Sequence, residues 1–240
     1  MQTIEYSGGS LRYMVTTPHG FNPPTSYPLI VLLHGGGDMN QLTHLAPEIN
    51  KTSYIYAFPQ APLQVPGGIP LAGTELDSTE GYSWHPYTPR GHRGPPPDDV
   101  VKGRLRAMEL LDGFLFEVMH RYRVQEARML LGGFAMGGSM TYRYGLAKPE
   151  NFVGLALLSA GEANPVELRP RLPSRRDQSI FIAHGTSDPL LNVEWSRKAV
   201  QFLDSEGYHT DYREYDAGHE ISADAVIDLS RWVAEVLPPS

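Results

Sequence analysis

The segment that most constrains this chain is residues 129–142, where a short apolar run passes through closely spaced glycines into a helical pattern. Residues 133–137 read Gly-Phe-Ala-Met-Gly. Glycines on both sides of position 135 let a strand and a helix approach closely around a strained turn. A bare G-x-x-x-G also suits an ordinary turn of small residues, so the motif needs support from the rest of the chain. The segment predicts a strand, a sharp turn with residue 135 at its apex, and a helix.

The remaining sequence alternates apolar runs with helical patterns. Residues 11–17 alternate as an antiparallel edge strand does, whereas continuous apolar runs, typical of strands covered on both faces, occur at residues 29–33, 129–131, 152–158 and 179–183. Helical patterns cover residues 98–122, 136–146, 193–203 and 222–237. In the first of these helices, one apolar stripe is formed by Val101, Leu105, Met108 and Phe116. The alternation predicts an α/β fold with a mostly parallel central sheet and helices on both faces.

The exception is residues 60–97, which are rich in proline and glycine and show no sustained period. A connection of this length inside a compact domain is usually functional or mobile. The intervals after the later strands are short, and none can hold an inserted cap domain. Residues 1–240 are therefore expected to form a single domain whose site, at the carboxyl ends of the strands, is open and roofed mainly by this loop.

Composition excludes several classes of protein. A net charge of −7 argues against nucleic acid or an anionic membrane as partner. The absence of cysteine excludes disulfides, a thiolate nucleophile and cysteine-bound metal. The N-terminus has no basic segment followed by an apolar one, and no apolar stretch reaches the roughly 18 residues that span a bilayer. The sequence predicts a cytoplasmic protein without stable membrane insertion.

A second glycine-rich turn follows the first buried run, because residues 32–38 read Leu-Leu-His-Gly-Gly-Gly-Asp. Consecutive glycines expose backbone N–H groups. Together with the N–H of the residue after the apex, such groups can form an oxyanion hole, for which Gly36 and Met136 are the predicted donors. A phosphate-binding turn is the alternative, but no G-x-G-x-x-G or Walker pattern follows.

Two polar residues complete the pattern downstream. Asp188 lies in the turn after the run at residues 179–183, and His219 lies after the next expected strand. Taken singly, the first suits a turn and the second flanks a helix. The order of apex, acid and base is nevertheless that of the α/β-hydrolases, in which the carboxylate orients the imidazole. In those enzymes the apex motif is G-x-S-x-G, whereas this chain has Ala135 at the serine position.

The other histidines fit structural roles. His34 and His184 stand next to glycines at strand ends, where hydrogen bonds from ring to backbone commonly hold a loop. His85 and His92 lie in the long loop without a third ligand at a suitable spacing. No metal site is expected.

As an ensemble, these segments resemble the phospholipase/carboxylesterase group of α/β-hydrolases, with its small carboxylesterases and acyl-protein thioesterases, and they are close to the dienelactone-hydrolase-like enzymes. The resemblance covers residues 27–237 and rests on residues 33–38, 59–62, 81–84, 133–137, 184–188 and 218–219. It implies an α/β-hydrolase fold without a cap domain and a Ser-His-Asp triad that hydrolyses small carboxylic or thiol esters without a cofactor. It also implies that Trp84 lines the acyl or alcohol pocket, although a buried tryptophan that anchors the loop is the alternative. Tyr82 and Leu190 are further predicted substrate contacts.

The departure from the family is at position 135, because a methyl group cannot attack a carbonyl. One interpretation is an active esterase in which an experimenter changed serine to alanine, leaving the fold intact and the protein inactive. The other is a natural, non-catalytic receptor that binds a small molecule in the same pocket. A neighbouring serine is a poor substitute, since Ser139 would lie one turn into the helix and Ser159 follows a different strand.

Overall fold

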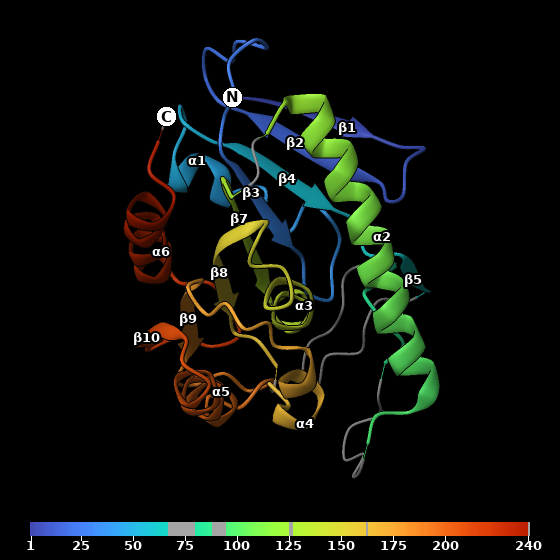
Figure 1. Cartoon of the computed structure of the whole chain (residues 1–240), viewed down its shortest axis with the longest axis vertical. Helices are drawn as coiled ribbons and strands as arrows, with labels where there is room; N and C mark the ends of the chain where they lie inside the picture. Colours follow the sequence, from blue (N-terminus) through green and yellow to red (C-terminus); the bar gives the residue numbers. More distant parts are fainter. Residues whose placement is uncertain (67–79, 88–94, 125–126, 162, 240) are drawn as a thin grey trace.

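The computed structural model describes residues 1–66, 80–87, 95–124, 127–161 and 163–239. An eight-stranded sheet runs through these residues (Figure 1). Its strands, in spatial order, are β1 (Gln2–Tyr6), β2 (Tyr13–Thr17), β4 (Ile55–Pro59), β3 (Leu29–Leu33), β7 (Met129–Phe134), β8 (Phe152–Leu158), β9 (Ser179–Gly185) and β10 (His209–Tyr215). The pairs β1–β2 and β2–β4 are antiparallel, and every pair from β4 to β10 is parallel. The carboxyl ends of six strands therefore share one edge of the sheet.

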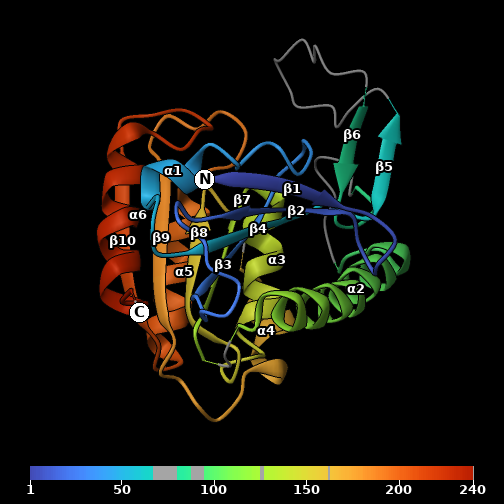
Figure 2. The same cartoon turned by 90° about the horizontal axis from the view of Figure 1, so that it is seen from above.

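Helices cover both faces of this sheet (Figure 2). One face packs against α2 (Asp98–Tyr122), α3 (Met136–Gly145) and α5 (Glu194–Ser205), and the other against α1 (Leu45–Ile49) and α6 (Ala223–Val236). A short helix, α4 (Pro165–Leu168), and a 3₁₀ turn, Arg169–Arg171, follow β8. Successive residues of β3 enter opposite cores, which explains why a strand buried on both faces reads as a continuous apolar run. The expected α/β-hydrolase architecture is confirmed, and the described residues contain no separate cap domain.

The expectation for residues 11–17 was wrong in one respect. Strand β2 begins at Tyr13 and lies between β1 and β4, so β1 forms the edge of the sheet. Strand β1 has four exposed residues of its five and little apolar alternation, because an edge strand with both faces largely in water needs none. The N-terminal segment therefore carries no sequence pattern that would have placed it in the sheet.

The stripe predicted for α2 was wrong for two of its four residues, although Met108 packs against the core. Phe116 is 64% exposed and Leu105 is 41% exposed, whereas the side that faces the sheet carries Val100, Ala107, Leu111, Phe114, Leu115 and Val118. Asp112 lies in line with the predicted stripe and accepts a hydrogen bond from the hydroxyl of Tyr144. Because α2 has apolar residues on adjacent sides, its packing against the sheet, and not its own sequence pattern, determines which side is buried.

Part of the segment at residues 60–97 is regular. Strands β5 (Leu63–Pro66) and β6 (Glu80–Ser83) form an antiparallel pair beside the main sheet (Figure 2). Residues 67–79 and 88–94 of the expected roof lie outside the described residues. Where the chain is described, none of its helices combines the length and apolar character that a membrane span requires. The cytoplasmic location stays a prediction.

Candidate active site

Ala135 occupies the sharp turn between β7 and α3. Its backbone angles are φ 51° and ψ −113°, a region that residues with a side chain rarely adopt. The N–H of Ala135 donates to the carbonyl of Leu158 at 3.0 Å, and its carbonyl accepts from the N–H of Ser139 at 3.1 Å. The strained conformation is therefore fixed from the neighbouring strand on one side and from the helix on the other.

The two flanking glycines are required by close backbone contacts. A Cβ atom at Gly133 would lie 2.4 Å from the carbonyl group of Gly137, and a Cβ atom at Gly137 would lie 2.0 Å from the carbonyl oxygen of Leu33. Carbon atoms cannot approach backbone this closely without a shift of the chain. The expectation that these glycines let strand and helix meet is confirmed.

The glycine turn after β3 lies directly against the apex. A Cβ atom at Gly35 would come within 3.2 Å of the Cβ of Ala135. The N–H of Gly35 donates to Oε1 of Gln41 at 2.7 Å, which fixes the turn. The N–H groups of Gly36 and Met136 have no acceptor among the described residues, so both are free to bind a ligand. Their role as oxyanion donors stays a prediction.

His34 holds this turn in place, as expected for a structural histidine. Its Nδ1 donates to the carbonyl of Gly35 at 3.0 Å, and its Nε2 accepts from the N–H of Ala61 at 2.9 Å. The ring is 1% exposed, and burial lowers its pKa to about 4. A neutral ring with one proton satisfies both contacts. The indole N–H of Trp84 donates to the backbone carbonyl of His34 at 2.9 Å, which ties the long loop to the same turn.

The acid and the base predicted from the sequence are hydrogen-bonded to each other. Nδ1 of His219 lies 2.7 Å from Oδ2 of Asp188, whose side chain is 0% exposed. Because a carboxylate only accepts, Nδ1 carries the proton and Nε2 has a free lone pair. Within the described parts of the chain, Nε2 makes no hydrogen bond. The other carboxylate oxygen, Oδ1, accepts from the N–H groups of Leu190 and Leu191 at 2.8 and 2.9 Å.

The imidazole of His219 also lies next to the apex. Its ring centre is 4.7 Å from that of Phe134, the residue that precedes Ala135. Its side chain is 12% exposed, so one edge of the ring reaches solvent. Segments from the ends of β3, β7, β9 and β10 thus meet at one place, with a basic nitrogen, a buried carboxylate and two free N–H donors.

The predicted substrate contacts differ in exposure. Trp84 is 0% exposed, which is the arrangement of the loop anchor that the sequence left open. Tyr82 and Leu190 are partly exposed, and the N–H of Tyr82 donates to the carbonyl of Gly37 at 2.9 Å. The hydroxyl oxygen of Ser83 lies 3.2 Å from the sulfur of Met136, so the loop also touches the residue after the apex.

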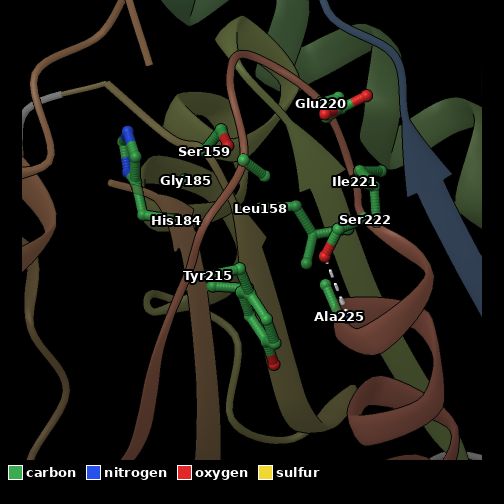
Figure 3. Close-up of a pocket in the computed structure, with 11 residues that line it drawn as sticks. Leu158, Ser159, His184, Gly185, Tyr215, Glu220, Ile221, Ser222 and Ala225 are labelled. Carbon is green, nitrogen blue, oxygen red and sulfur yellow. Dashed lines mark hydrogen bonds between the residues drawn. The ribbon is translucent and has the colours of Figure 1, made fainter. Parts of the chain in front are cut away.

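Two hollows adjoin the acid and base segments. A small cavity measures about 10 Å³ and is lined from β8, β9, the end of β10, the segment after His219 and the start of α6 (Figure 3); this is room for about one water molecule. An open depression is lined by residues of the Asp188 loop and the start of α5. Neither lining includes Ala135 or His219. Asp188 does line the open depression, and the ends of β9 and β10 line the small cavity.

Two further histidines, His85 and His92, were considered as metal ligands in the sequence. His85 is buried, its Nδ1 donates to the carbonyl of Pro86 at 2.8 Å, and burial lowers its pKa to about 4. His92 lies outside the described residues. No cluster of three or more His, Cys, Asp or Glu able to hold a metal occurs in the described ranges.

One contact of the site was not predicted from the sequence. His184 does hold a loop, since its Nε2 lies 2.9 Å from the carbonyl of Leu191. The same nitrogen, however, lies 3.3 Å from Oδ2 of Asp188. The available signal was the spacing of four residues between a strand-end histidine and the acid in the following turn.

Comparisons with known proteins indicate one family for this chain. Residues 23–237 match the Phospholipase/Carboxylesterase family. The acyl-protein thioesterase 1 of Mycosarcoma maydis is 24% identical, in an alignment that covers 95% of this chain and 98% of that protein. Among solved structures, esterase PE8 has a TM-score of 0.72 at 24% identity and covers 89% of this chain and 94% of its own. A carboxylesterase from Mesorhizobium loti has a TM-score of 0.72 at 19% identity, and the match covers 97% of this chain and 98% of that chain. With the sequence match spanning most of its length, this chain belongs to the phospholipase/carboxylesterase family of α/β-hydrolases.

Proposed function

We propose that this chain has the active site of a carboxylic ester hydrolase whose nucleophile position is occupied by Ala135, and that the chain as it stands does not turn over ester. The observation that carries the proposal is the Asp188–His219 pair, at 2.7 Å, beside an elbow where the N–H groups of Gly36 and Met136 are free. A carboxylate, an imidazole base and oxyanion donors placed together at one backbone turn are the groups that catalyse acyl transfer.

With a serine at position 135, the residues present account for each step. Nε2 of His219 takes the hydroxyl proton as the oxygen attacks the ester carbonyl, while Asp188 holds the ring and stabilises the imidazolium. The N–H groups of Gly36 and Met136 receive the negative charge of the tetrahedral intermediate. His219 then gives the proton to the leaving alcohol, and a water molecule, deprotonated by the same nitrogen, releases the acid.

The substrates we propose are small carboxylic esters with short acyl or aryl groups. Tyr82 and Leu190 are partly exposed near the site and are the proposed walls of the cleft. Trp84, being fully buried, supports the wall from below in this arrangement. Thiol esters are included because several relatives are acyl-protein thioesterases.

A second candidate function follows from Ala135 itself. A chain that keeps its glycine turn and its acid–base pair but has a methyl group at the apex can bind an ester or an acid without reacting. A natural receptor of this kind differs from an esterase with a substituted serine only in what the restored hydroxyl would do. Reversion at position 135 therefore separates the two.

The experiment is the variant Ala135→Ser, assayed with p-nitrophenyl acetate and butyrate beside the parent chain. Loss of a triad nucleophile costs on the order of 10⁶ in kcat, so restoration is expected to raise the rate by at least about 10⁴-fold. The matched control is Ala135→Ser with His219→Gln, which retains the hydroxyl but lacks the base. A revertant no faster than the parent chain would exclude the esterase and favour the receptor.

A further inference from the structure

The buried carboxylate of Asp188 has a second imidazole beside it. Nε2 of His184 lies 3.3 Å from Oδ2, the same oxygen that accepts from His219 at 2.7 Å. The side chains of His184 and Asp188 are both 0% exposed. His184 stands at the end of β9, and its ring lies at the wall of the small cavity on the side away from Ser222 (Figure 3). Water is thus excluded from the contact between the two side chains.

The partners of His184 determine where its proton lies. Nε2 is 2.9 Å from the carbonyl of Leu191 and faces the carboxylate, and both of these groups only accept. Nε2 is therefore protonated. Nδ1 lies 2.7 Å from the hydroxyl of Ser196 on α5, which donates to it when the ring is neutral. Hydrogen bonds with Ser196 and Leu191 thus hold the ring of His184 in place, with its Nε2 3.3 Å from the carboxylate.

The two oxygens of Asp188 are held in different ways. Oδ1 accepts two backbone N–H groups from its own loop, those of Leu190 and Leu191. Among the described residues, Oδ2 meets only the two imidazoles. Without the ring of His184 beside it, the carboxylate could turn about the fixed Oδ1, and the hydrogen bond to His219 would lose its fixed direction.

We propose that His184 is a positioning residue for the acid–base pair: the protonated Nε2 edge of its ring lies against Oδ2 of Asp188 and limits the rotation of the carboxylate, and through it the ring of His219, while Ser196 holds His184 in the required tautomer. The catalytic consequence rests on the proposed ester hydrolysis, but the effect on the geometry of His219 does not. A residue that merely held the loop through Leu191 would act on Asp188 only through Oδ1, which accepts from the N–H of Leu191, and not through Oδ2.

Two substitutions separate these roles. His184→Gln places an amide N–H near the position of Nε2, toward Asp188, whereas His184→Asn places one near Nδ1, toward Ser196, and cannot reach the carboxylate. Both side chains are polar and smaller than or similar to histidine. Thermal unfolding and circular dichroism of each variant serve as the check on folding.

The decisive measurement uses the chain with Ala135 unchanged. Proton and ¹⁵N NMR of the imidazoles should show a low-field resonance for the Nδ1 proton of His219 in the parent chain. We expect His184→Gln to keep it, and His184→Asn to broaden it or move it upfield with the loss of a single His219 tautomer. An identical His219 signal in both variants would overturn the proposal. If His184→Asn does not fold, Ser196→Ala replaces it, and an unchanged His219 signal there would overturn the proposal equally.

The activity arm uses the same substitutions in the Ala135→Ser background. Misplacement of a catalytic group by about 1 Å can cost on the order of 10²-fold in rate. We expect His184→Asn to lower kcat by about 10- to 100-fold with little change in KM, and His184→Gln to restore most of it. If His184→Asn had the same kcat as the Ala135→Ser chain, the positioning role would be contradicted. An Ala135→Ser chain without activity would overturn the proposed function, while the NMR result would still decide the role of His184.

Discussion

The elbow and the acid–base pair lie at the same edge of the sheet, but different interactions hold them in place. The elbow is fixed by backbone alone: Ala135 bonds through its N–H and carbonyl, and the flanking glycines allow contacts that no side chain would permit. The pair is fixed by side chains, because the carboxylate of Asp188 accepts two backbone N–H groups and faces two imidazoles. Consequently, the side chain at position 135 can change without altering the framework, whereas the pair depends on each of its members.

Two histidines that adjoin glycines near strand ends, His34 and His219, also differ in how they are held. Both ring nitrogens of His34 are occupied, and burial lowers its pKa to about 4. His219 has one ring nitrogen occupied by Asp188, and the other has no partner among the described residues. Similar sequence contexts thus yield one ring that supports the turn and one that is available for proton transfer.

The largest expected effect tests whether the pair acts on position 135. In the Ala135→Ser background, His219→Gln removes the base, and the loss in kcat should be on the order of 10⁴-fold or more. In the parent chain the same change should leave the slow background rate as it was, since a methyl group has no proton to give. Steady-state kinetics with p-nitrophenyl butyrate measure both. A similar loss in both backgrounds would mean that His219 acts without the residue at 135.

The next effect tests the backbone side of the comparison. Gly137→Ala places a Cβ atom 2.0 Å from the carbonyl oxygen of Leu33, so strand and helix must separate. We expect a loss in the free energy of unfolding of about 3 kcal/mol or more, in the range of overpacked cores. Gly218→Ala is the control at the same edge, because its Cβ would have no heavy atom within 4 Å. Urea denaturation of both variants gives the comparison, and equal stabilities would contradict the proposed contact.

The third effect tests the contrast between the two histidines through pH. His34 has a pKa lowered from about 6.5 to about 4 in the folded state, so between these values only the unfolded chain gains its proton. The contribution of His34 to the free energy of unfolding is therefore complete above pH 6.5. It falls by about 3 kcal/mol as the pH drops toward 4. His85 adds a loss of the same sign. Denaturant unfolding at pH 7 and pH 4.5 measures the decrease.

The matched variants for this effect are His34→Asn and His19→Gln. The first removes the buried imidazole and should be less stable at pH 7, but its stability should depend less steeply on pH. The second changes an exposed ring and should follow the parent chain. A pH slope in His34→Asn equal to that of the parent would show that the loss arises elsewhere.

Much of this arrangement could be predicted from the sequence, because its determinants are local. Continuous apolar runs located the buried parallel strands β3, β7, β8 and β9, although β4, equally buried, was not predicted. The order of position 135, Asp188 and His219 followed from the strand ends on which they lie. Helix α2 was predicted with the bounds that the structure gives, Asp98–Tyr122. Hydrophobic period and turn residues carry this information within a short window.

The features that were missed depend on distant partners. Strand β1 is largely exposed and has only β2 as a neighbour in the sheet, so its own residues carry no periodic signal. The buried side of α2 is chosen by the sheet, which left Phe116 in solvent. The contact of His184 with Asp188 depends on how the turn after β9 folds back, which no periodic pattern records.

The smallest expected effect concerns the strain at position 135, where φ is 51° and ψ is −113°. An alanine there has the steric cost of a Cβ atom in a region that suits glycine, roughly 1 kcal/mol or more. Ala135→Gly should therefore raise the free energy of unfolding by about 0.5 to 1 kcal/mol, since relief of the strain exceeds the extra freedom of the unfolded chain. Ala135→Ser, which keeps the Cβ atom, should leave stability close to that of the parent. The strain serves no purpose in a chain without a nucleophile, so a more stable glycine variant would indicate that the turn is shaped to present a reactive side chain. Destabilisation by glycine would instead mean that the methyl group packs well enough against Gly35 to outweigh the strain.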